Sequence, residues 1–235
     1  MEAKTIKYKQ IARIAGATYL ALIFLGIFSE AVVRSSLVSY SDASLTAENI
    51  LQSEFLFRLG IVGDILVLFG DIVLAVLLFF LLKTFNKTLA VLAMTFRLAV
   101  VAVSSVNVLN MLSVLLLISG SEYLKSFSVE QIESLVLFFF KLHSYGYDVV
   151  LTLFSAHCLI IGALFAKSRI IPGVFGIAFL ITASCYFIFS FSSFLLPEVS
   201  QSLYPIILLP PLITELALAL WLLVKGVNQS KYNVL

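Results

Sequence analysis

The chain has 235 residues, of which 61% are hydrophobic and only 12% are charged, and its mean hydropathy is +1.11. A soluble domain usually carries about 25% charged residues, so this composition excludes a soluble globular protein and predicts that lipid is the main solvent. The net charge of +2, without a basic run interleaved with aromatic residues, gives no indication of nucleic acid, and we expect none as a partner.

Six stretches are long and apolar enough to cross a bilayer. A spanning helix needs about 20 mostly apolar residues, because roughly 30 Å of hydrocarbon is crossed at about 1.5 Å per residue. Helix is the expected state, since lipid offers the backbone no hydrogen-bond partners and the alternation of barrel strands is absent. The predicted spans are 12–34, 58–82, 90–119, 145–166, 170–194 and 204–225.

The fold class predicted from these spans is all-α, a polytopic integral membrane protein with six transmembrane helices in one bundle. The loops leave no room for a separate soluble domain, so residues 1–235 are expected to form a single domain. The segment Ser29-Glu30-Ala31 also fits a signal-peptide cleavage site. Glu30 and the long apolar stretch favour an uncleaved anchor instead.

The charges outside the spans predict the orientation. Acids dominate one side, whereas Glu2 is the only acid among the basic residues of the other side, which are Lys4, Lys7, Lys9, Arg13, Lys83, Lys87, Lys167, Arg169, Lys225 and Lys231. Because cytoplasmic loops carry an excess of Lys and Arg, we expect both termini in the cytoplasm and the protein in a cell (inner) membrane. An even number of spans agrees with this orientation.

Two longer segments lie on the expected outer side. Ser44 to Asn49 (SLTAEN) carries a helix-start signal, and Ser128 with Gln131 fits a capping box. The apolar run within residues 127–144 is too short to span. We predict an interfacial helix before the fourth span, or a long tilted extension of that span.

The second predicted span repeats the triplet Gly-Asp-Ile, which places Asp64 and Asp71 seven residues apart. Seven residues bring the two acids within about 20° around the helix. An ionisable group inside a membrane normally faces protein or water, and small residues allow helices to approach closely. The stripe of Gly63, Asp64, Gly70 and Asp71 is therefore expected to face the other helices.

Further polar residues are expected to meet this stripe. By depth, Arg97 is the predicted partner of Asp71, and the amides of Asn107 and Asn110 lie at about the level of Asp64. His157 is given an inward position. Asp148, nine residues earlier and so on the opposite side of the helix, is expected at the interface.

Glu215 and the pair Glu30–Arg34 remain to be interpreted. Glu215 follows Pro210-Pro211, which should interrupt helical hydrogen bonding just before it. A carboxylate beside a broken helix is typical of transporter ion sites. Glu30 and Arg34 read as an ordinary interfacial i,i+4 contact. The candidate polar core is thus Asp64, Asp71, Arg97, Asn107, His157 and Glu215.

No motif of a soluble enzyme is present. The chain has no G-x-S-x-G, H-E-x-x-H, phosphate-binding glycine loop or dinucleotide fingerprint, and its two cysteines fall inside apolar segments. We therefore predict no catalytic residue, metal site or cofactor. The Asp71–Arg97 pair could fix helix register or carry function, and His157 is more typical of a hydrogen-bonded core residue than of a ligand.

Several blocks of sequence point to a family. The stretches RIAGATYLALIFLGIFSE, ENILQSEFLFRLGIVGDIL, MTFRLAVVAVSSVNVLN and LHSYGYDVVLTLFSAH, followed by KSRIIPGVFGIAFL, resemble the bacterial membrane proteins grouped as the domain of unknown function 4386 family. The resemblance covers roughly residues 10–226 and implies a prokaryotic six-helix inner-membrane protein. Because the family carries no established activity, it implies no site residues.

Three functions remain in view. The first is a non-catalytic helical bundle that binds a lipid, a small solute or a partner subunit. The second is a small-solute or proton-coupled transporter that uses Asp71, Arg97 and Glu215, although no inverted repeat is detectable. The third is an intramembrane hydrolase. We favour the first, with the lipid bilayer as the certain partner.

Overall fold

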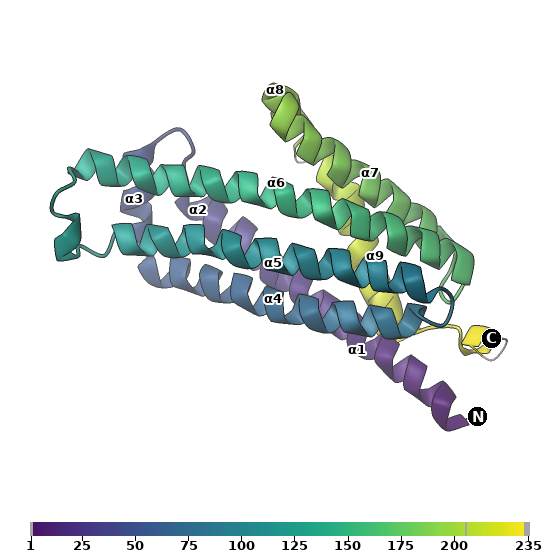
Figure 1. The fold of residues 1–235 in the computed structure, drawn as a ribbon. Helices are drawn as coiled ribbons and strands as arrows, with labels where there is room; N and C mark the ends of the chain where they lie inside the picture. The colour runs from purple at the N-terminus through teal and green to yellow at the C-terminus, as the bar shows by residue number, and fades with distance from the viewer. Residues whose placement is uncertain (1, 205, 233–235) are drawn as a thin grey trace. The chain divides into compact units, whose positions relative to one another are not determined.

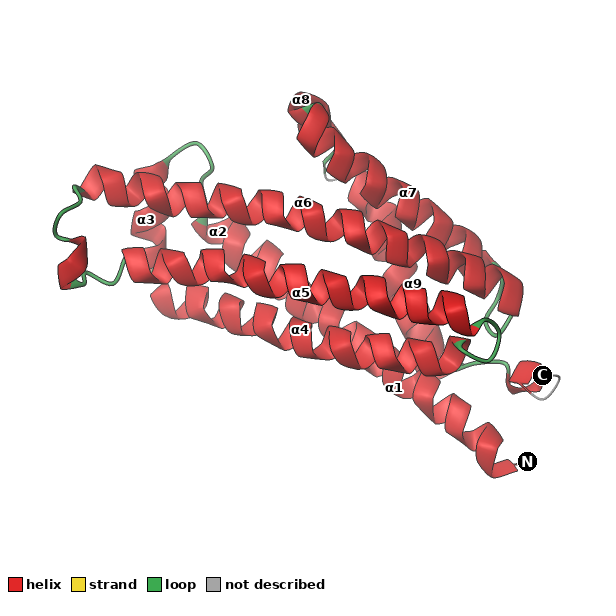
Figure 2. Ribbon diagram, in the orientation of Figure 1, coloured by secondary structure: helices red, strands yellow, loops and turns green. Residues whose placement is uncertain are grey.

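The computed structural model describes residues 2–204 and 206–232, which form helices and connections without a strand (Figure 1, Figure 2). Six helical segments are long and apolar enough to cross a membrane: Tyr8–Leu37, Glu54–Leu82, Lys87–Leu117, Val129–Ser168, Val174–Leu195 and Ile206–Val224. The all-α class and six candidate spans are thereby confirmed. Residue 205 of the last predicted span, residue 1 and residues 233–235 lie outside the described part.

The chain divides into two compact units. Unit 1 comprises Met1–Ile23, Phe69–Val101 and Asp148–Leu235, and unit 2 comprises Phe24–Leu68 and Ala102–Tyr147. The α-helices are α1 (Glu2–Ile27), α2 (Ser35–Leu37), α3 (Ala43–Gln52), α4 (Glu54–Leu82), α5 (Lys87–Leu117), α6 (Val129–Ser168), α7 (Val174–Leu195), α8 (Pro197–Leu203) and α9 (Leu209–Val224). By these bounds, α1, α4, α5 and α6 each contribute one segment to each unit.

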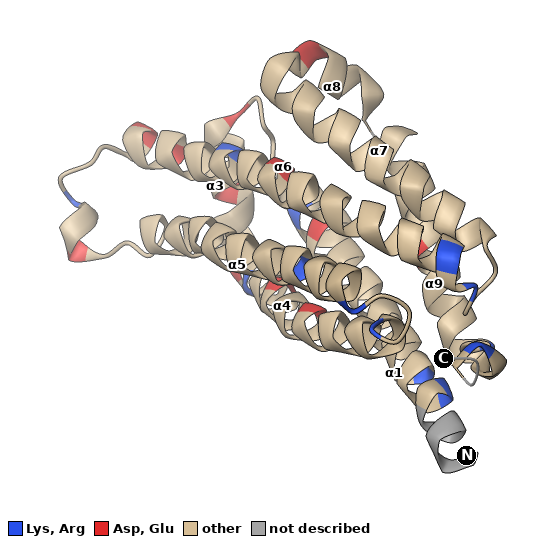
Figure 3. Ribbon diagram, turned by 45° about the vertical axis from the view of Figure 1, so that its right-hand side comes forward, with Lys and Arg blue, Asp and Glu red and all other residues tan. Residues whose placement is uncertain are grey.

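Unit 1 contains the first part of α1, the later parts of α4 and α6, the beginning of α5, and all of α7, α8 and α9. Within it, α7 packs against α8 and α9. Fully buried side chains include Leu74, Phe165, Phe179 and Leu218. Lys and Arg residues of this unit gather near the start of α1 and at the connection between α6 and α7 (Figure 3).

Unit 2 has its own hydrophobic core. Ile50 from α3, Phe57 from α4, Met111 from α5 and Phe140 from α6 are all buried there. The rings of Phe57 and Phe140 lie 5.8 Å apart in a tilted arrangement. A seven-residue π-helix, Phe28–Arg34, links α1 to α2 in this unit.

The predicted helix starts on the expected outer side are present. The capping box at α6 is confirmed, because Ser128 N donates to Gln131 Oε1 at 2.8 Å and Gln131 N donates to Ser128 Oγ at 3.3 Å. α3 is also present, but its N-cap is Asp42, whose carboxylate accepts from Leu45 N at 2.9 Å. The start signal therefore lies two residues before the predicted Ser44.

The interfacial helix is not a separate element. α6 runs as one helix of 40 residues, so residues 129–144 continue into the fourth span. Such a helix is about 60 Å long, roughly twice the thickness of the hydrocarbon layer. Of the two predicted alternatives, an interfacial helix or an extension of the fourth span, the extension describes residues 129–144.

The prolines before Glu215 begin a helix instead of breaking one. A 3₁₀ turn, Ile206–Leu208, precedes α9, and Pro210 and Pro211 occupy its first turn. Proline is tolerated there because the first-turn N–H groups have no intrahelical partner. The predicted interruption beside Glu215 was therefore wrong: Glu215 lies in the second turn of a regular helix.

Candidate functional site

The glycines of the Gly-Asp repeat lie where helices approach closely, as predicted. In unit 2, a Cβ added to Gly63 would lie 2.6 Å from Ser29 Oγ. In unit 1, a Cβ added to Gly70 would lie 2.4 Å from Leu22 Cδ2. Each aspartate next to these glycines takes part in a different cluster, named here after its arginine.

The Arg97 cluster, in unit 1, consists of Asp71 on α4, Arg97 on α5 and His157 on α6. Arg97 Nε donates to Asp71 Oδ1 at 3.0 Å, and Arg97 Nη2 donates to the same oxygen. Arg97 is only 2% exposed. The predicted pairing of Asp71 with Arg97 is therefore confirmed, and it ties α4 to α5.

His157 joins this cluster from α6. Its Nδ1 lies 2.8 Å from the carbonyl oxygen of Ala93, and its Nε2 lies 3.3 Å from Arg97 Nη1. A carbonyl oxygen only accepts and a guanidinium only donates, so Nδ1 carries the proton and Nε2 accepts. His157 is thus a neutral, fully hydrogen-bonded residue that links α5 to α6.

Aromatic rings complete the surroundings of Arg97. Its Cζ lies 5.3 Å from the ring centroid of Tyr19 and 5.2 Å from that of Phe154. A guanidinium within about 6 Å of an aromatic ring is attracted by the ring quadrupole. The Phe154 ring also stacks on the ring of His157. The cation is therefore held by one carboxylate, one imidazole and two rings.

Glu215 is less completely surrounded. It is partly exposed, and its Oε1 accepts a hydrogen bond from Tyr186 Oη on α7 at 2.7 Å. Tyr19 Oη is close enough to Glu215 to interact electrostatically. Yet this buried hydroxyl has no hydrogen bond of ordinary geometry within the described residues, and neither does Thr182 Oγ1 on α7.

The sequence led us to expect Asp148 at the membrane interface, but the structure buries it within unit 1. It is 6% exposed, and one of its carboxylate oxygens accepts a hydrogen bond from Ser193 Oγ on α7. His157, on the opposite side of α6, contacts α5. Both residues are buried because this part of α6 packs against other helices on two sides.

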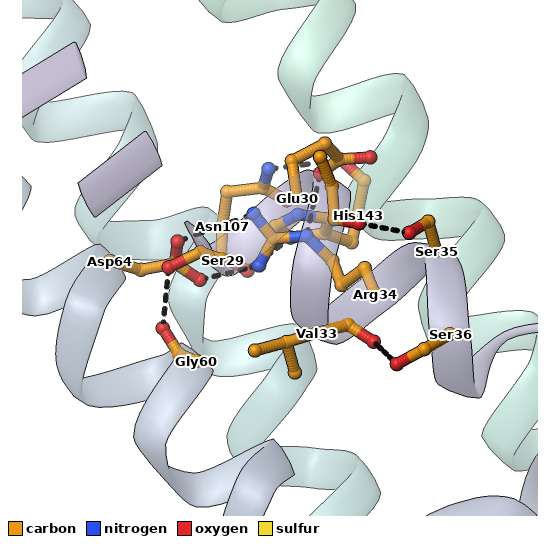
Figure 4. Close-up of polar contacts among 11 residues, drawn as sticks. Ser29, Glu30, Val33, Arg34, Ser35, Ser36, Gly60, Asp64, Asn107 and His143 are labelled. Atoms are coloured by element: carbon orange, nitrogen blue, oxygen red, sulfur yellow. Dashed lines mark hydrogen bonds and ion pairs between the residues drawn. The ribbon is translucent and has the colours of Figure 1, made fainter. Parts of the chain in front are cut away.

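The Arg34 cluster lies in unit 2 (Figure 4). Arg34 Nη1 donates to Asp64 Oδ2 at 2.7 Å, Nη2 donates to Asp64 Oδ1 at 3.3 Å, and Nε donates to Glu30 Oε2 at 2.6 Å. The side chain of Arg34 is 10% exposed and that of Asp64 is 15% exposed, whereas that of Glu30 is 60% exposed. The predicted i,i+4 pair of Glu30 with Arg34 is confirmed, but it is not an ordinary interfacial contact, since Arg34 is buried and also pairs with Asp64 on α4.

The amides near this cluster bond elsewhere. Asn107 Nδ2 donates to the carbonyl oxygen of His143 at 3.0 Å, and Asn110 Nδ2 donates to Asn107 Oδ1 at 2.8 Å. Asp64 therefore has a guanidinium as its partner in place of the predicted amides. Asn107 therefore joins α5 to α6 through the backbone carbonyl of His143. Both residues are drawn in Figure 4.

The sequence reasoning missed Arg34 as a core residue. It lies at the end of the predicted first span, where a basic residue usually marks an interface. The helix is in the π form from Phe28 to Arg34, and Ser29 Oγ from this segment donates to the Gly60 carbonyl oxygen at 3.0 Å. One signal could have revealed Arg34: the sequence reasoning left Asp64 without a cationic partner, and Arg34 lies at about the same depth as Asp64.

These observations define a multi-pass α-helical membrane protein with a buried ion-pair cluster in each unit. Among the residues that the structure describes, no group of three or more His, Cys, Asp or Glu side chains is placed to hold a metal ion. The family model for a domain of unknown function (DUF4386) matches residues 14–226, so the chain belongs to this family. Neither the comparison with curated proteins nor that with solved structures found a match.

Proposed function

We propose that the chain is a non-catalytic protein of a bacterial inner membrane that binds a lipid, a small solute or a partner subunit. The Arg97 and Arg34 clusters then serve to hold helices in register. The observation that carries this proposal is the closed set of partners around Arg97: Asp71, His157 and two aromatic rings surround a side chain that is 2% exposed.

The energetics of such a pair support a structural role. Removing one partner of a buried ion pair costs about 3–5 kcal/mol, because the remaining charge is left uncompensated. Replacing both partners is often nearly neutral. A register-fixing pair should therefore tolerate joint neutralisation much better than the loss of either charge alone.

The proposed orientation has the N- and C-termini in the cytoplasm. Its support is the excess of Lys and Arg near the start of α1 and at the α6–α7 connection (Figure 3). A reporter that is active only outside the cytoplasm, fused after residue 235, should be inactive. Fused within the connection between α5 and α6, it should be active; the reverse pattern overturns the orientation.

The structural role of the Arg97 cluster is tested with Asp71→Asn, Arg97→Gln and the double variant. We expect each single variant to lower the melting temperature and membrane abundance strongly, and the double variant to recover most of both. Glu54→Gln is the control, because it breaks an exposed ion pair with Arg58. Single variants that keep wild-type stability would overturn the proposal.

Glu215 favours one alternative, a proton-coupled transporter. This carboxylate is partly exposed, accepts a hydrogen bond from Tyr186, and lies near the hydroxyl of Tyr19. Transport would require proton movement through Glu215. Proteoliposomes with an imposed pH gradient test this directly: flux that Glu215→Gln abolishes supports transport, and absence of flux in the wild type rejects it.

A further inference from the structure

A cavity of about 490 Å³ lies in unit 1, where α6 ends, α7 begins and α9 ends. It falls within the range of about 300–1,000 Å³ that is typical of small-molecule sites. The backbone N–H of Asn228 donates to the carbonyl oxygen of Ile170 at 2.7 Å, which joins its two walls. The lining residues are Arg169, Ile170, Ile171, Pro172, Gly173, Trp221, Lys225, Gly226, Val227 and Asn228.

Two of the lining side chains are cationic. Arg169 and Lys225 are both exposed, and within the described residues no ion pair or side-chain hydrogen bond engages either of them. The lining holds no Asp or Glu. An anion that enters this cavity therefore meets two unneutralised positive charges and no carboxylate.

Arg169 occupies a backbone position that favours glycine. It follows the last residue of α6 with a φ of +51°, and its N–H donates to the Phe165 carbonyl oxygen. α9 also ends next to a left-handed residue, but there it is Gly226, two residues after Val224, with a φ of +72°. Arginine in this conformation costs about 1–2 kcal/mol relative to glycine. Arg169 thus lines the cavity at the expense of backbone stability.

The other walls suit a lipid headgroup. Trp221 lies beside the Phe175 ring, with the centroids 5.8 Å apart, and tryptophan is enriched where membrane meets water. The lining also includes three buried apolar residues, Ile170, Ile171 and Val227. Basic pockets between helices on the cytoplasmic side of a membrane are suited to anionic headgroups.

We propose that this cavity binds a phosphate group through Arg169 and Lys225, carried either by an anionic phospholipid or by a free phosphate compound. The proposal deepens the proposed function, on which it rests, by naming the chemical class of the ligand. Arginine supplies a planar fork of donors that matches phosphate oxygens, and lysine supplies a second point charge.

Trp221 makes binding measurable, because it is the only tryptophan in the chain and it lines the cavity. Full-length protein in a non-ionic detergent is titrated with short-chain phosphatidylglycerol, glycerol phosphate, inorganic phosphate and a short-chain monoglyceride. We expect a saturable change in Trp221 fluorescence with the phosphate compounds. Saturation by phosphatidylglycerol alone identifies a lipid ligand, and equal saturation by glycerol phosphate or inorganic phosphate identifies a free one.

Charge variants test the assigned side chains. Arg169→Gln with Lys225→Gln should raise the Kd about tenfold or more, the loss expected for charge-assisted hydrogen bonds. The matched control is Lys87→Gln with Lys167→Gln, which removes equal charge from exposed residues that do not line the cavity. Arg169→Gly should also weaken binding while relieving the backbone, so that misfolding does not explain the loss.

A steric variant is independent of charge. Gly173 lines the cavity with a φ of −60°, and a Cβ there would meet nothing within 4 Å. Gly173→Leu should therefore fill the cavity and weaken binding, whereas Gly26→Leu, at another open glycine, should not.

Equal Kd values in wild type and the Arg169/Lys225 double variant overturn the proposal. So does monoglyceride binding as tight as that of phosphatidylglycerol. The register test on Asp71 and Arg97 does not involve this cavity, so each proposal can fail separately.

Discussion

Arg34 and Asp64, thirty residues apart in sequence, form a two-point ion pair in unit 2, with nitrogen–oxygen distances of 2.7 and 3.3 Å. The paired geometry matches the fork of a guanidinium to the two oxygens of a carboxylate. The ion pair connects the π-helical segment Phe28–Arg34 with α4. Glu30 adds a third contact from a largely exposed position.

Breaking this pair from one side should destabilise the protein strongly. Asp64→Asn leaves Arg34 buried without its main counter-charge, and we expect a loss of about 3 kcal/mol in the free energy of unfolding. Glu30→Gln should cost less than about 1 kcal/mol, because that side chain is 60% exposed. Denaturant unfolding in detergent measures both; similar losses would contradict the assignment of Asp64 as the principal partner.

The six spans were predictable because length and apolar composition are local properties of the sequence. The ion pairs depend on depth and on direction around each helix. Depth alone was enough for Asp71 and Arg97. Depth alone was not enough for Arg34, which lies in a π-helix. The side-chain directions in that segment differ from those calculated for a regular α-helix.

Asp148 shows a second limit of sequence reasoning. Its position opposite His157 on α6 was correctly derived, but it was combined with the assumption that α6 has only one buried side. In the structure the two residues contact α7 and α5, respectively. Likewise, Pro210-Pro211 indicates either a broken helix or the first turn of a new one, and the residues before it did not decide between them.

His157 should contribute to stability through its hydrogen bonds. His157→Phe keeps an aromatic ring but removes the donor to Ala93 and the acceptor for Arg97. Leaving buried polar groups without partners costs about 1–3 kcal/mol each, so we expect a clear fall in melting temperature. His157→Gln, which keeps a donor and an acceptor, should recover part of the loss. No difference between the two variants would show that these hydrogen bonds do not stabilise the fold.

Tyr232, outside the spans, should make stability depend on alkaline pH. Its hydroxyl donates to the Leu81 carbonyl oxygen at 2.9 Å, and its ring stacks on Tyr8. Burial and the nearby Tyr8 raise the pKa of Tyr232 above its usual value of about 10. A raised pKa means that the folded state holds the proton more tightly, so this stabilisation is complete below about pH 10 and is lost as pH rises further.

The matched variant for that prediction is Tyr232→Phe. At neutral pH it should be less stable than wild type by about 1 kcal/mol, the usual contribution of one hydrogen bond. Between about pH 10 and 11 the difference should shrink, because only the wild type loses stability through this group. Unfolding curves at several pH values measure the difference. A constant gap across this range would contradict the raised pKa.

Close packing of α1 against α9 in unit 1 should depend on Gly16. A Cβ at this position would lie 2.4 Å from the backbone nitrogen of Leu223 and 2.6 Å from the carbonyl oxygen of Ala219. Backbone atoms cannot rotate away as a side chain can, so Gly16→Ala must push the two helices apart. We expect a loss of more than about 2 kcal/mol, within the range for overpacking.

Gly26→Ala provides the control for this packing prediction on the same helix. A Cβ there would meet nothing within 4 Å, and alanine favours helix over glycine by up to about 1 kcal/mol. Gly26→Ala should therefore be as stable as the wild type or slightly more stable. Melting temperatures of the two variants in one detergent give the comparison. If the two variants have the same melting temperature, the contact between α1 and α9 does not constrain the fold. If the melting temperature of Gly16→Ala is well below that of Gly26→Ala, the neighbouring backbone requires glycine at position 16.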